Sequence, residues 1–186
     1  MQGHSDIPVD DATLAELSPL SQDWQQVPCL SSPLKRCRQT AKALGLDPVD
    51  TPLLIEQHWG DWEGYTLAEL RDLEGAEEFR ANEDRGLDFE PMCGESPRQV
   101  QWRLEPLMQQ LAGEEGPAIL MTHKGVIRAL LGLATSWNFM GKPPARVGHD
   151  RAQILWLHPD ARLTAGPLDL RLDELPSVAE IMAQAK

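Results

Sequence analysis

The chain has 186 residues, of which 41% are hydrophobic, and it carries a formal net charge of −12. This length is sufficient for one domain with a proper core. The acidic excess argues against nucleic acid and against an anionic membrane surface as a general partner. An anionic ligand would therefore need a pocket in which a few cationic side chains gather.

The three cysteines, Cys29, Cys37 and Cys93, form no Cys-x-x-Cys pair. This argues against a disulfide framework and against a zinc site, and it favours reduced thiols in a cytoplasmic protein. The first residues lack the basic and apolar regions of a signal peptide, and no apolar run approaches the length of a transmembrane helix.

The N-terminal part predicts a loop over residues 1–8, a short helix within 10–20 and a strand over 27–30. A helix should then begin at the serine pair of residues 31–32, with Gly45 ending it. Arg36 falls in its first or second turn, where a cation opposes the helix dipole. A residue placed against a local rule often serves a site, although a solvated surface arginine is the alternative.

Residues 53–55 predict another short strand, with Glu56 at its end. The following loop, residues 57–64, contains two glycines and two tryptophans. It would wall a pocket and present a carboxylate, or its tryptophans would fill the edge of the core. A helix should follow over 66–73 with a Thr66/Glu69 capping box. Residues 75–97 are charged and irregular, as in a lid or an insertion.

Further along, Ser96 should cap an amphipathic helix that ends at Gly113. The apolar run Ala118–Met121 predicts a central, buried strand, and a helix should start near Gly125. His123 then lies at the carboxyl end of a strand, where open α/β sheets bind ligands, beside a helix start that favours anions. The alternative is that Thr122 caps the helix and His123 is a satisfied buried histidine.

The C-terminal part predicts a loop over residues 141–150, a strand over 153–157, a strand pair or extended arm over 162–172, and a weakly anchored helix over 178–185. Internal repeats and linkers are absent from the sequence. Residues 1–186 are therefore expected to form a single α/β domain.

Three side chains at predicted element ends together suit phosphoryl transfer. Arg36 can pair with phosphate oxygens through its planar fork. His123 can hydrogen-bond a phosphoryl group or attack it. Glu56 can deliver a proton to the leaving oxygen.

Four motifs in order resemble those of the histidine phosphatase superfamily, also called phosphoglycerate mutase-like. Residues 2–8, with Gly3, resemble the substrate loop, and residues 31–41, with Arg36, resemble the phosphate-arginine helix. Residues 54–64, with Glu56 and a Trp-Glu-Gly triplet, resemble the acid motif. Residues 122–128, Thr-His-Lys-Gly-Val-Ile-Arg, resemble the second-histidine motif, with Lys124 where glycine is more usual.

This resemblance implies a three-layer α/β fold with a mostly parallel sheet flanked by helices. It implies that Arg36 and His123 hold the phosphoryl group, that Glu56 is the general acid, and that Gly3 and Lys124 contact substrate. The substrate would be a small phosphorylated metabolite, and the chemistry would need neither a metal nor another cofactor. The short chain and the Trp-Glu-Gly triplet look more like the small phosphatases than the longer mutases of the family.

The departure from the family pattern is at the N-terminus. The family's nucleophile is the histidine of an Arg-His-Gly motif that ends the first strand, and this motif is absent from the 186 residues. None of His4, His58, His149 and His158 has that context. We therefore expect an N-terminally truncated domain whose first strand is missing.

The full-length parent should be a phosphatase that works through a phosphohistidine, whereas this chain should be weak or inactive. The alternatives are an inactive phosphate-binding pseudoenzyme or regulatory module, a non-functional fragment, and a mutase-type phosphoryl transfer. The sequence predicts neither the physiological substrate nor the oligomeric state.

Overall fold

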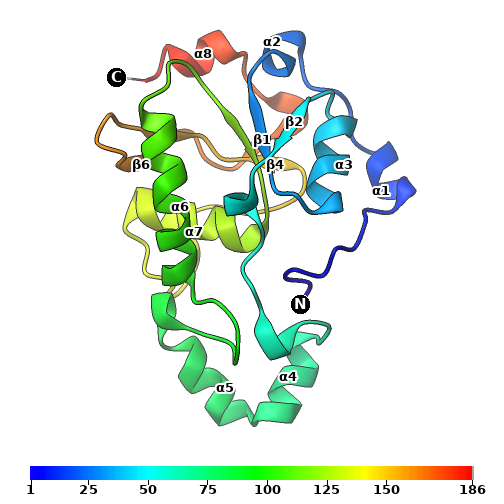
Figure 1. Ribbon diagram of the computed structural model, residues 1–186, viewed down its shortest axis with the longest axis vertical. Coiled ribbons are helices and arrows are strands. Elements are labelled where there is room, and N and C mark those ends of the chain that lie inside the picture. Colours follow the sequence, from blue (N-terminus) through cyan, green and yellow to red (C-terminus); the bar gives the residue numbers. More distant parts are fainter. Residues whose placement is uncertain (186) are drawn as a thin grey trace.

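Three short parallel strands form the centre of the molecule (Figure 1). They are β1 (Cys29–Ser31), β2 (Pro48–Asp50) and β3 (Ile119–Met121), in the order β2-β1-β3. In their register Cys29 lies opposite both Pro48 and Ile119. The structure, a computed structural model, describes residues 1–185.

Helices pack on both faces of this sheet, because successive strand residues point to opposite sides. Leu30 and Leu120 contact a core built largely from α6 (Pro97–Ala112) and α7 (Lys124–Thr135). On the other face, Cys29 packs with Ala41 and Leu44 at the end of α3 (Lys35–Ala43), near α1 (Asp11–Ala15). The expected α/β fold with a parallel sheet between helices is confirmed.

The position predicted for the strand at 118–121 is wrong. The strand exists as β3, but it lies at one end of the strand order and its three residues are only half-buried. Among the described residues it pairs with β1 alone. A short apolar run fits an edge strand packed by helices as well as a central strand, so its composition does not fix its place.

Two small antiparallel sheets complete the C-terminal part: β4 (Arg151–Ala152) with β7 (Leu170–Arg171), and β5 (Leu155–Leu157) with β6 (Leu163–Ala165). The strands predicted within 162–172 are present, but they pair with β4 and β5 and not with each other. A 3-10 helix, η4 (Leu172–Glu174), follows.

The terminal helix α8 (Val178–Met182) is anchored more firmly than its length suggested. Its Ile181 is buried against Trp24 of α2 (Gln22–Gln25), and the Trp24 indole N–H donates to the Pro176 carbonyl at 2.7 Å. The prediction of a weakly anchored C-terminal helix was therefore wrong.

Local capping signals were reliable for two helices and misleading for one. The predicted Thr66/Glu69 capping box is present at α4 (Leu67–Glu74), and the predicted cap Ser96 is present at α6, where it forms a capping box with Gln99. By contrast, α3 begins after Leu34 without a side-chain cap. The Ser32 hydroxyl accepts from the Leu34 N–H at 3.3 Å, one position before the helix, and also contacts His123 Nε2 at 2.7 Å.

Residues 53–55 do not form the predicted strand. Pro52–Leu54 form a 3-10 helix, η1, and the apolar character of this run is explained by Leu54, which is fully buried in the core with α6 and α7. A three-residue apolar run is too short for its period to distinguish these structures.

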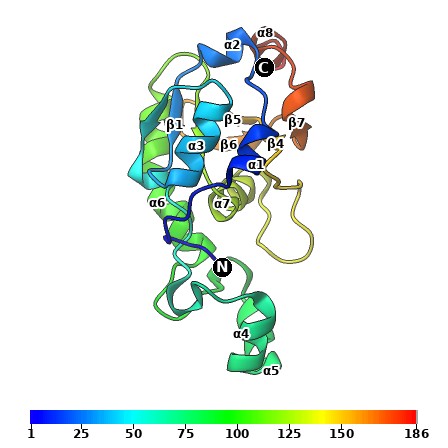
Figure 2. The same ribbon diagram turned by 90° about the vertical axis from the view of Figure 1, so that its right-hand side faces the viewer.

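The segment expected to be irregular is partly helical. It contains α5 (Ala76–Glu83) and η3 (Gly86–Asp88), and α4 and α5 form a hairpin that projects away from the sheet in both views (Figures 1 and 2). At its base, after η2 (Gly60–Trp62), the Trp62 ring lies 5.0 Å from Phe79 and 5.4 Å from Phe89 between centroids. Trp62 therefore fills a small core beneath the hairpin.

Candidate active site

The carboxyl ends of β1 and β3 bring the first two site residues together. Because Ser31 and Met121 are in register, Ser32 and His123 leave the sheet at the same edge. The Ser32 N–H donates to the Met121 carbonyl at 2.9 Å, and the His123 ring lies 2.7 Å from the Ser32 hydroxyl through Nε2. His123 is also the N-cap residue of α7, and Thr122 instead donates through its hydroxyl to the Leu54 carbonyl at 2.7 Å.

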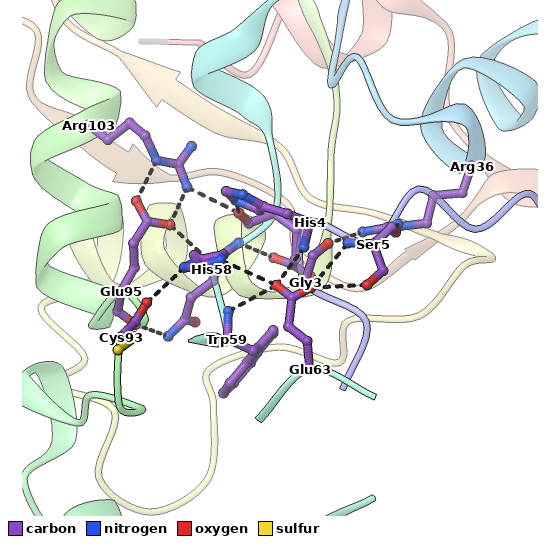
Figure 3. A network of polar contacts seen from close by, with 12 residues as sticks. Gly3, His4, Ser5, Arg36, His58, Trp59, Glu63, Cys93, Glu95 and Arg103 are labelled. Atoms are coloured by element: carbon purple, nitrogen blue, oxygen red, sulfur yellow. Dashed lines mark hydrogen bonds and ion pairs between the residues drawn. The ribbon is translucent and has the colours of Figure 1, made fainter. Parts of the chain in front are cut away.

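Arg36, in the first turn of α3, points at this edge and is not a solvated surface residue. Its Nε donates to His123 Nδ1 at 3.1 Å. Its two terminal nitrogens donate to the carbonyl oxygens of Ser5 and Gly3, each at 2.7 Å (Figure 3). The structure thus joins Arg36, His123 and the Gly3 backbone, three of the residues singled out from the sequence.

These contacts fix the protonation of His123. Because Nδ1 accepts a hydrogen bond from a guanidinium, the ring proton lies on Nε2, which donates to Ser32. Burial, the nearby positive charge of Arg36 and the proximity of His4 and Arg103 lower the pKa of His123 to about 3. His123 is therefore a neutral imidazole at physiological pH, with an N–H available for an oxygen acceptor.

Glu56 lies on the other side of the same edge, with only 9% of its surface exposed. Its carboxylate accepts from the backbone N–H of Gln57 at 2.8 Å and of Gly125, at the start of α7, at 3.1 Å. A Cβ at position 125 would lie 2.6 Å from Glu56 Oε1, so only glycine permits this approach.

Burial is the largest influence on Glu56 and raises its pKa, although the backbone donors and Arg36 act in the opposite direction. A raised pKa keeps a carboxylic acid protonated to higher pH. Glu56 therefore has the property that a proton donor to a leaving group requires.

Arg103 on α6 holds the segment that carries Glu56. It donates to the Leu53 carbonyl and, at 3.5 Å, to the Glu56 carbonyl. Its guanidinium is itself fixed by Glu95, with Nε and Oε1 2.9 Å apart (Figure 3). Sequence reasoning missed both residues, because they act through contacts with a segment far away in the chain.

Glu63, from the Trp-Glu-Gly triplet, ties the N-terminal loop to the site. Its carboxylate accepts from the His4 N–H at 2.8 Å and from the Ser5 N–H and hydroxyl at 3.2 and 3.0 Å (Figure 3). Gly3 has a φ of +49°, and a Cβ there would lie 1.9 Å from Glu63 Oε1. The glycine is therefore required where the loop passes this carboxylate.

His4, which sequence reasoning set aside, lies close to the site. Its Nε2 is 2.8 Å from the Glu56 carbonyl oxygen, and because a carbonyl can only accept, Nε2 carries the proton. Its ring lies 4.6 Å from that of His58 between centroids. The only sequence signal for this placement was its position next to Gly3 in the loop motif.

The structure places Lys124 at the first position of α7, next to His123, with an exposed side chain. It lines a pocket with Arg128. Among residues 1–185 there is no group of three or more His, Cys, Asp or Glu side chains placed to hold a metal ion. In the same part of the chain, no helix combines the length and apolarity that crossing a bilayer requires.

The neutral state of His123 predicts a distinctive pH dependence of stability. The unfolded chain binds a proton near pH 6.5, whereas folded His123 does so only near its pKa of about 3. The contribution of His123 to the free energy of unfolding is therefore fully present above pH 6.5 and decreases as the pH falls below it. Between pH 7.5 and 5 the parent should lose about 2 kcal/mol more unfolding free energy than His123→Gln. Urea titrations at the two pH values measure this, and parallel pH profiles would refute the neutral assignment.

Known proteins resemble this chain in sequence and in fold. Residues 1–165 match the sequence profile described as Histidine phosphatase superfamily (branch 1). The chain is 33% identical over 100 residues to fructose-2,6-bisphosphatase of Saccharomyces cerevisiae, covering 54% of this chain and 22% of that protein. It is 34% identical over 131 residues to glucosyl-3-phosphoglycerate phosphatase of Mycolicibacterium vanbaalenii, covering 60% of this chain and 57% of that protein.

The chain thus spans less than two thirds of the length of these two relatives. Among solved structures, a mycobacterial glucosyl-3-phosphoglycerate phosphatase in complex with inorganic phosphate superposes with a TM-score of 0.72 at 26% identity, covering 95% of this chain and 93% of the other. The profile match extends over most of the chain and includes every residue of the site described above. The chain therefore belongs to the histidine phosphatase superfamily, branch 1.

Proposed function

We propose that the protein represented by this chain hydrolyses phosphomonoesters through a phosphohistidine intermediate. The observation that carries the proposal is the direct contact of Arg36 with neutral His123, beside the buried carboxyl group of Glu56. A cationic fork, a neutral N–H donor and a buried carboxyl group whose pKa is raised by burial lie at one sheet edge and match the needs of phosphoryl transfer, which depends mainly on positioning and electrostatics.

In this proposal Arg36 and His123 hold the phosphoryl group. Two Arg36 nitrogens now donate to the carbonyl oxygens of Gly3 and Ser5, and phosphate oxygens would take over part of these bonds. The Nε2–H of His123, which in the structure donates to the Ser32 hydroxyl, would donate to a phosphoryl oxygen instead. Gly3 and Lys124 would contact the substrate.

Glu56 is proposed as the general acid. Its raised pKa favours the protonated form that can donate to the leaving oxygen. Its carboxyl group approaches the start of α7 through Gly125, one residue from Lys124 and two from His123, so it would face a phosphoryl group held there.

The nucleophile is proposed to be a histidine outside these 186 residues, in an Arg-His-Gly segment that ends a preceding strand. His123 is unsuited to the role, because its Nδ1 accepts from Arg36 and its Nε2 carries the proton. The chain as written should then have little or no turnover of its own. An inactive phosphate-binding pseudoenzyme would share this property, and so would a fragment without function; a mutase-type transfer would need the same histidine.

For the substrate we propose a small phosphorylated metabolite of the sugar or sugar-acid type. The relatives named above are phosphatases of fructose 2,6-bisphosphate and of glucosyl 3-phosphoglycerate. The α4–α5 hairpin stands on the side of the molecule where the N-terminus lies (Figures 1 and 2), and it is the proposed lid over such a substrate.

Replacing Arg36 by alanine should weaken binding of inorganic phosphate or vanadate by roughly 1.5–3 kcal/mol, the range for hydrogen bonds to a charged group. Titration calorimetry measures the change. Arg38→Ala is the matched control, because Arg38 lies on the same helix but its guanidinium pairs with Asp50 at 3.2 Å, whereas that of Arg36 contacts His123. Equal affinities of Arg36→Ala and the parent would remove Arg36 as a phosphate ligand.

A further inference from the structure

The cations of this acidic chain are unevenly distributed. Residues 116–149 contain no Asp or Glu, although the whole chain has 29 acidic residues against 17 Lys and Arg. The same stretch contains Lys124, Arg128, Lys142 and Arg146. A local excess of positive charge of this kind is what an acidic protein needs to bind an anion.

The structure gathers these four cations around one pocket. Lys124 and Arg128 come from the first turns of α7, and Lys142 and Arg146 come from the loop that precedes β4. The pocket has a volume of about 480 Å³, which lies in the range for small-molecule sites. A ligand of metabolite size therefore fits it better than a macromolecular partner.

The positive charge of the pocket is not neutralised from within. The only acidic residue among those lining it is Asp169, and its carboxylate already pairs with Arg151 at 3.3 Å. Within residues 1–185 none of the four cations forms a salt bridge.

The Nε atom of Arg128 is buried and, within the described part of the chain, has no hydrogen-bond partner. A buried donor without a partner is costly, so it marks a place where a ligand acceptor would be stabilising.

The pocket adjoins the proposed phosphoryl site through the start of α7. Lys124 follows His123 directly, the Gly125 N–H donates to Glu56 at 3.1 Å, and Arg128, one turn further, interacts electrostatically with Glu56. One molecule could thus place one end on Arg36 and His123 and the other in the pocket.

We propose that the pocket formed by Lys124, Arg128, Lys142 and Arg146 binds a second anionic group, a carboxylate or a phosphate, of the phosphomonoester held at Arg36 and His123. This inference rests on the proposed function. It narrows the substrate class to phosphomonoesters with a second negative charge, and it assigns Lys142 and Arg146, outside the four motifs, as residues that determine specificity.

The test compares two ligands that differ in one group, 3-phosphoglycerate with a carboxylate and glycerol 3-phosphate with a hydroxymethyl group. Titration calorimetry should show that the parent binds 3-phosphoglycerate roughly tenfold more tightly, or better, as expected for hydrogen bonds to a charged group. The double variant Lys142→Ala/Arg146→Ala should reduce this ratio to about twofold or less. Lys142→Arg/Arg146→Lys, which keeps both charges, should retain most of it.

The double variant Arg85→Ala/Arg162→Ala is the matched control, because it removes two cations that are exposed and lie outside the pocket. This control should leave the ratio of the two affinities unchanged. If it also reduced the ratio to about twofold or less, the effect would come from net charge and the pocket assignment would be overturned. Equal affinity of the parent for both ligands, with both weakened by Arg36→Ala, would overturn this inference and leave the proposed function standing. Binding of neither ligand by the parent would overturn both.

Discussion

Extending the chain upstream by a strand that ends in Arg-His-Gly is expected to raise hydrolysis of p-nitrophenyl phosphate by roughly 10³-fold or more over the 186-residue chain. The reason is that binding and electrostatics alone leave only a small part of the catalysis once a nucleophile is absent. Steady-state assays of the two proteins, purified in the same way, measure the difference.

The matched control is the extended protein in which the added histidine alone is replaced by alanine, and it should be as slow as the unextended chain. Acid quench of the active form with labelled substrate should trap the phosphoryl group on the added histidine. Ordinary enzyme rates from the unextended chain, lost in His123→Ala or in His4→Ala, would show that one of these residues is the nucleophile. An extended chain that folds and binds phosphate but has no turnover would favour the pseudoenzyme.

In the extended protein, Glu56→Gln should lower kcat by roughly 10²- to 10⁴-fold, the usual contribution of a general acid. Glutamine can still accept the hydrogen bonds that Gln57 and Gly125 donate to Glu56, but it has no proton to give. The loss should be largest with alkyl phosphates, whose leaving oxygen needs the proton, and smallest with p-nitrophenyl phosphate.

The pH profile supplies an independent sign for Glu56. Activity should fall as the pH rises through the pKa of Glu56, where the general acid loses its proton. Because burial raises this pKa, the fall should occur at a higher pH than for an ordinary glutamate, and the activity of Glu56→Gln should not show it. Glu105→Gln, on the exposed side of α6, should change neither kcat nor the profile. A loss in Glu56→Gln that is the same for all leaving groups would assign Glu56 to binding instead.

Local rules predicted local structure well in this chain. The capping box at Thr66 and the cap at Ser96 are present, because each depends on residues three positions apart. The same reasoning failed at Ser32, because its hydroxyl accepts from the Leu34 N–H and contacts the long-range partner His123, while the helix begins only at Lys35. The place of β3 in the sheet likewise depends on pairing with β1, which no local pattern specifies.

The site shows the same division between local and long-range information. Arg36, Glu56 and His123 were recognisable by residue type, motif and position at element ends, and the fold brings them together. Arg103 and Glu95 were not recognisable, since Arg103 lies 47 residues from the Glu56 carbonyl that it supports. Lys142 and Arg146 belong to no motif, and only the packing of their loop beside α7 shows that they share a pocket with Arg128.

The convergence of Arg36 on a neutral His123 is tested most directly by NMR of the histidine side chains in ¹⁵N-labelled protein, recorded between pH 5 and 8 with and without inorganic phosphate. We expect His123 to remain a single neutral tautomer with its proton on Nε2 over this range, in keeping with a pKa of about 3. The ¹⁵N resonances of its ring should shift when phosphate is added to the parent and to Arg38→Ala, but not when it is added to Arg36→Ala. A His123 ring that titrates near pH 6.5 and does not respond to phosphate would contradict the site described here.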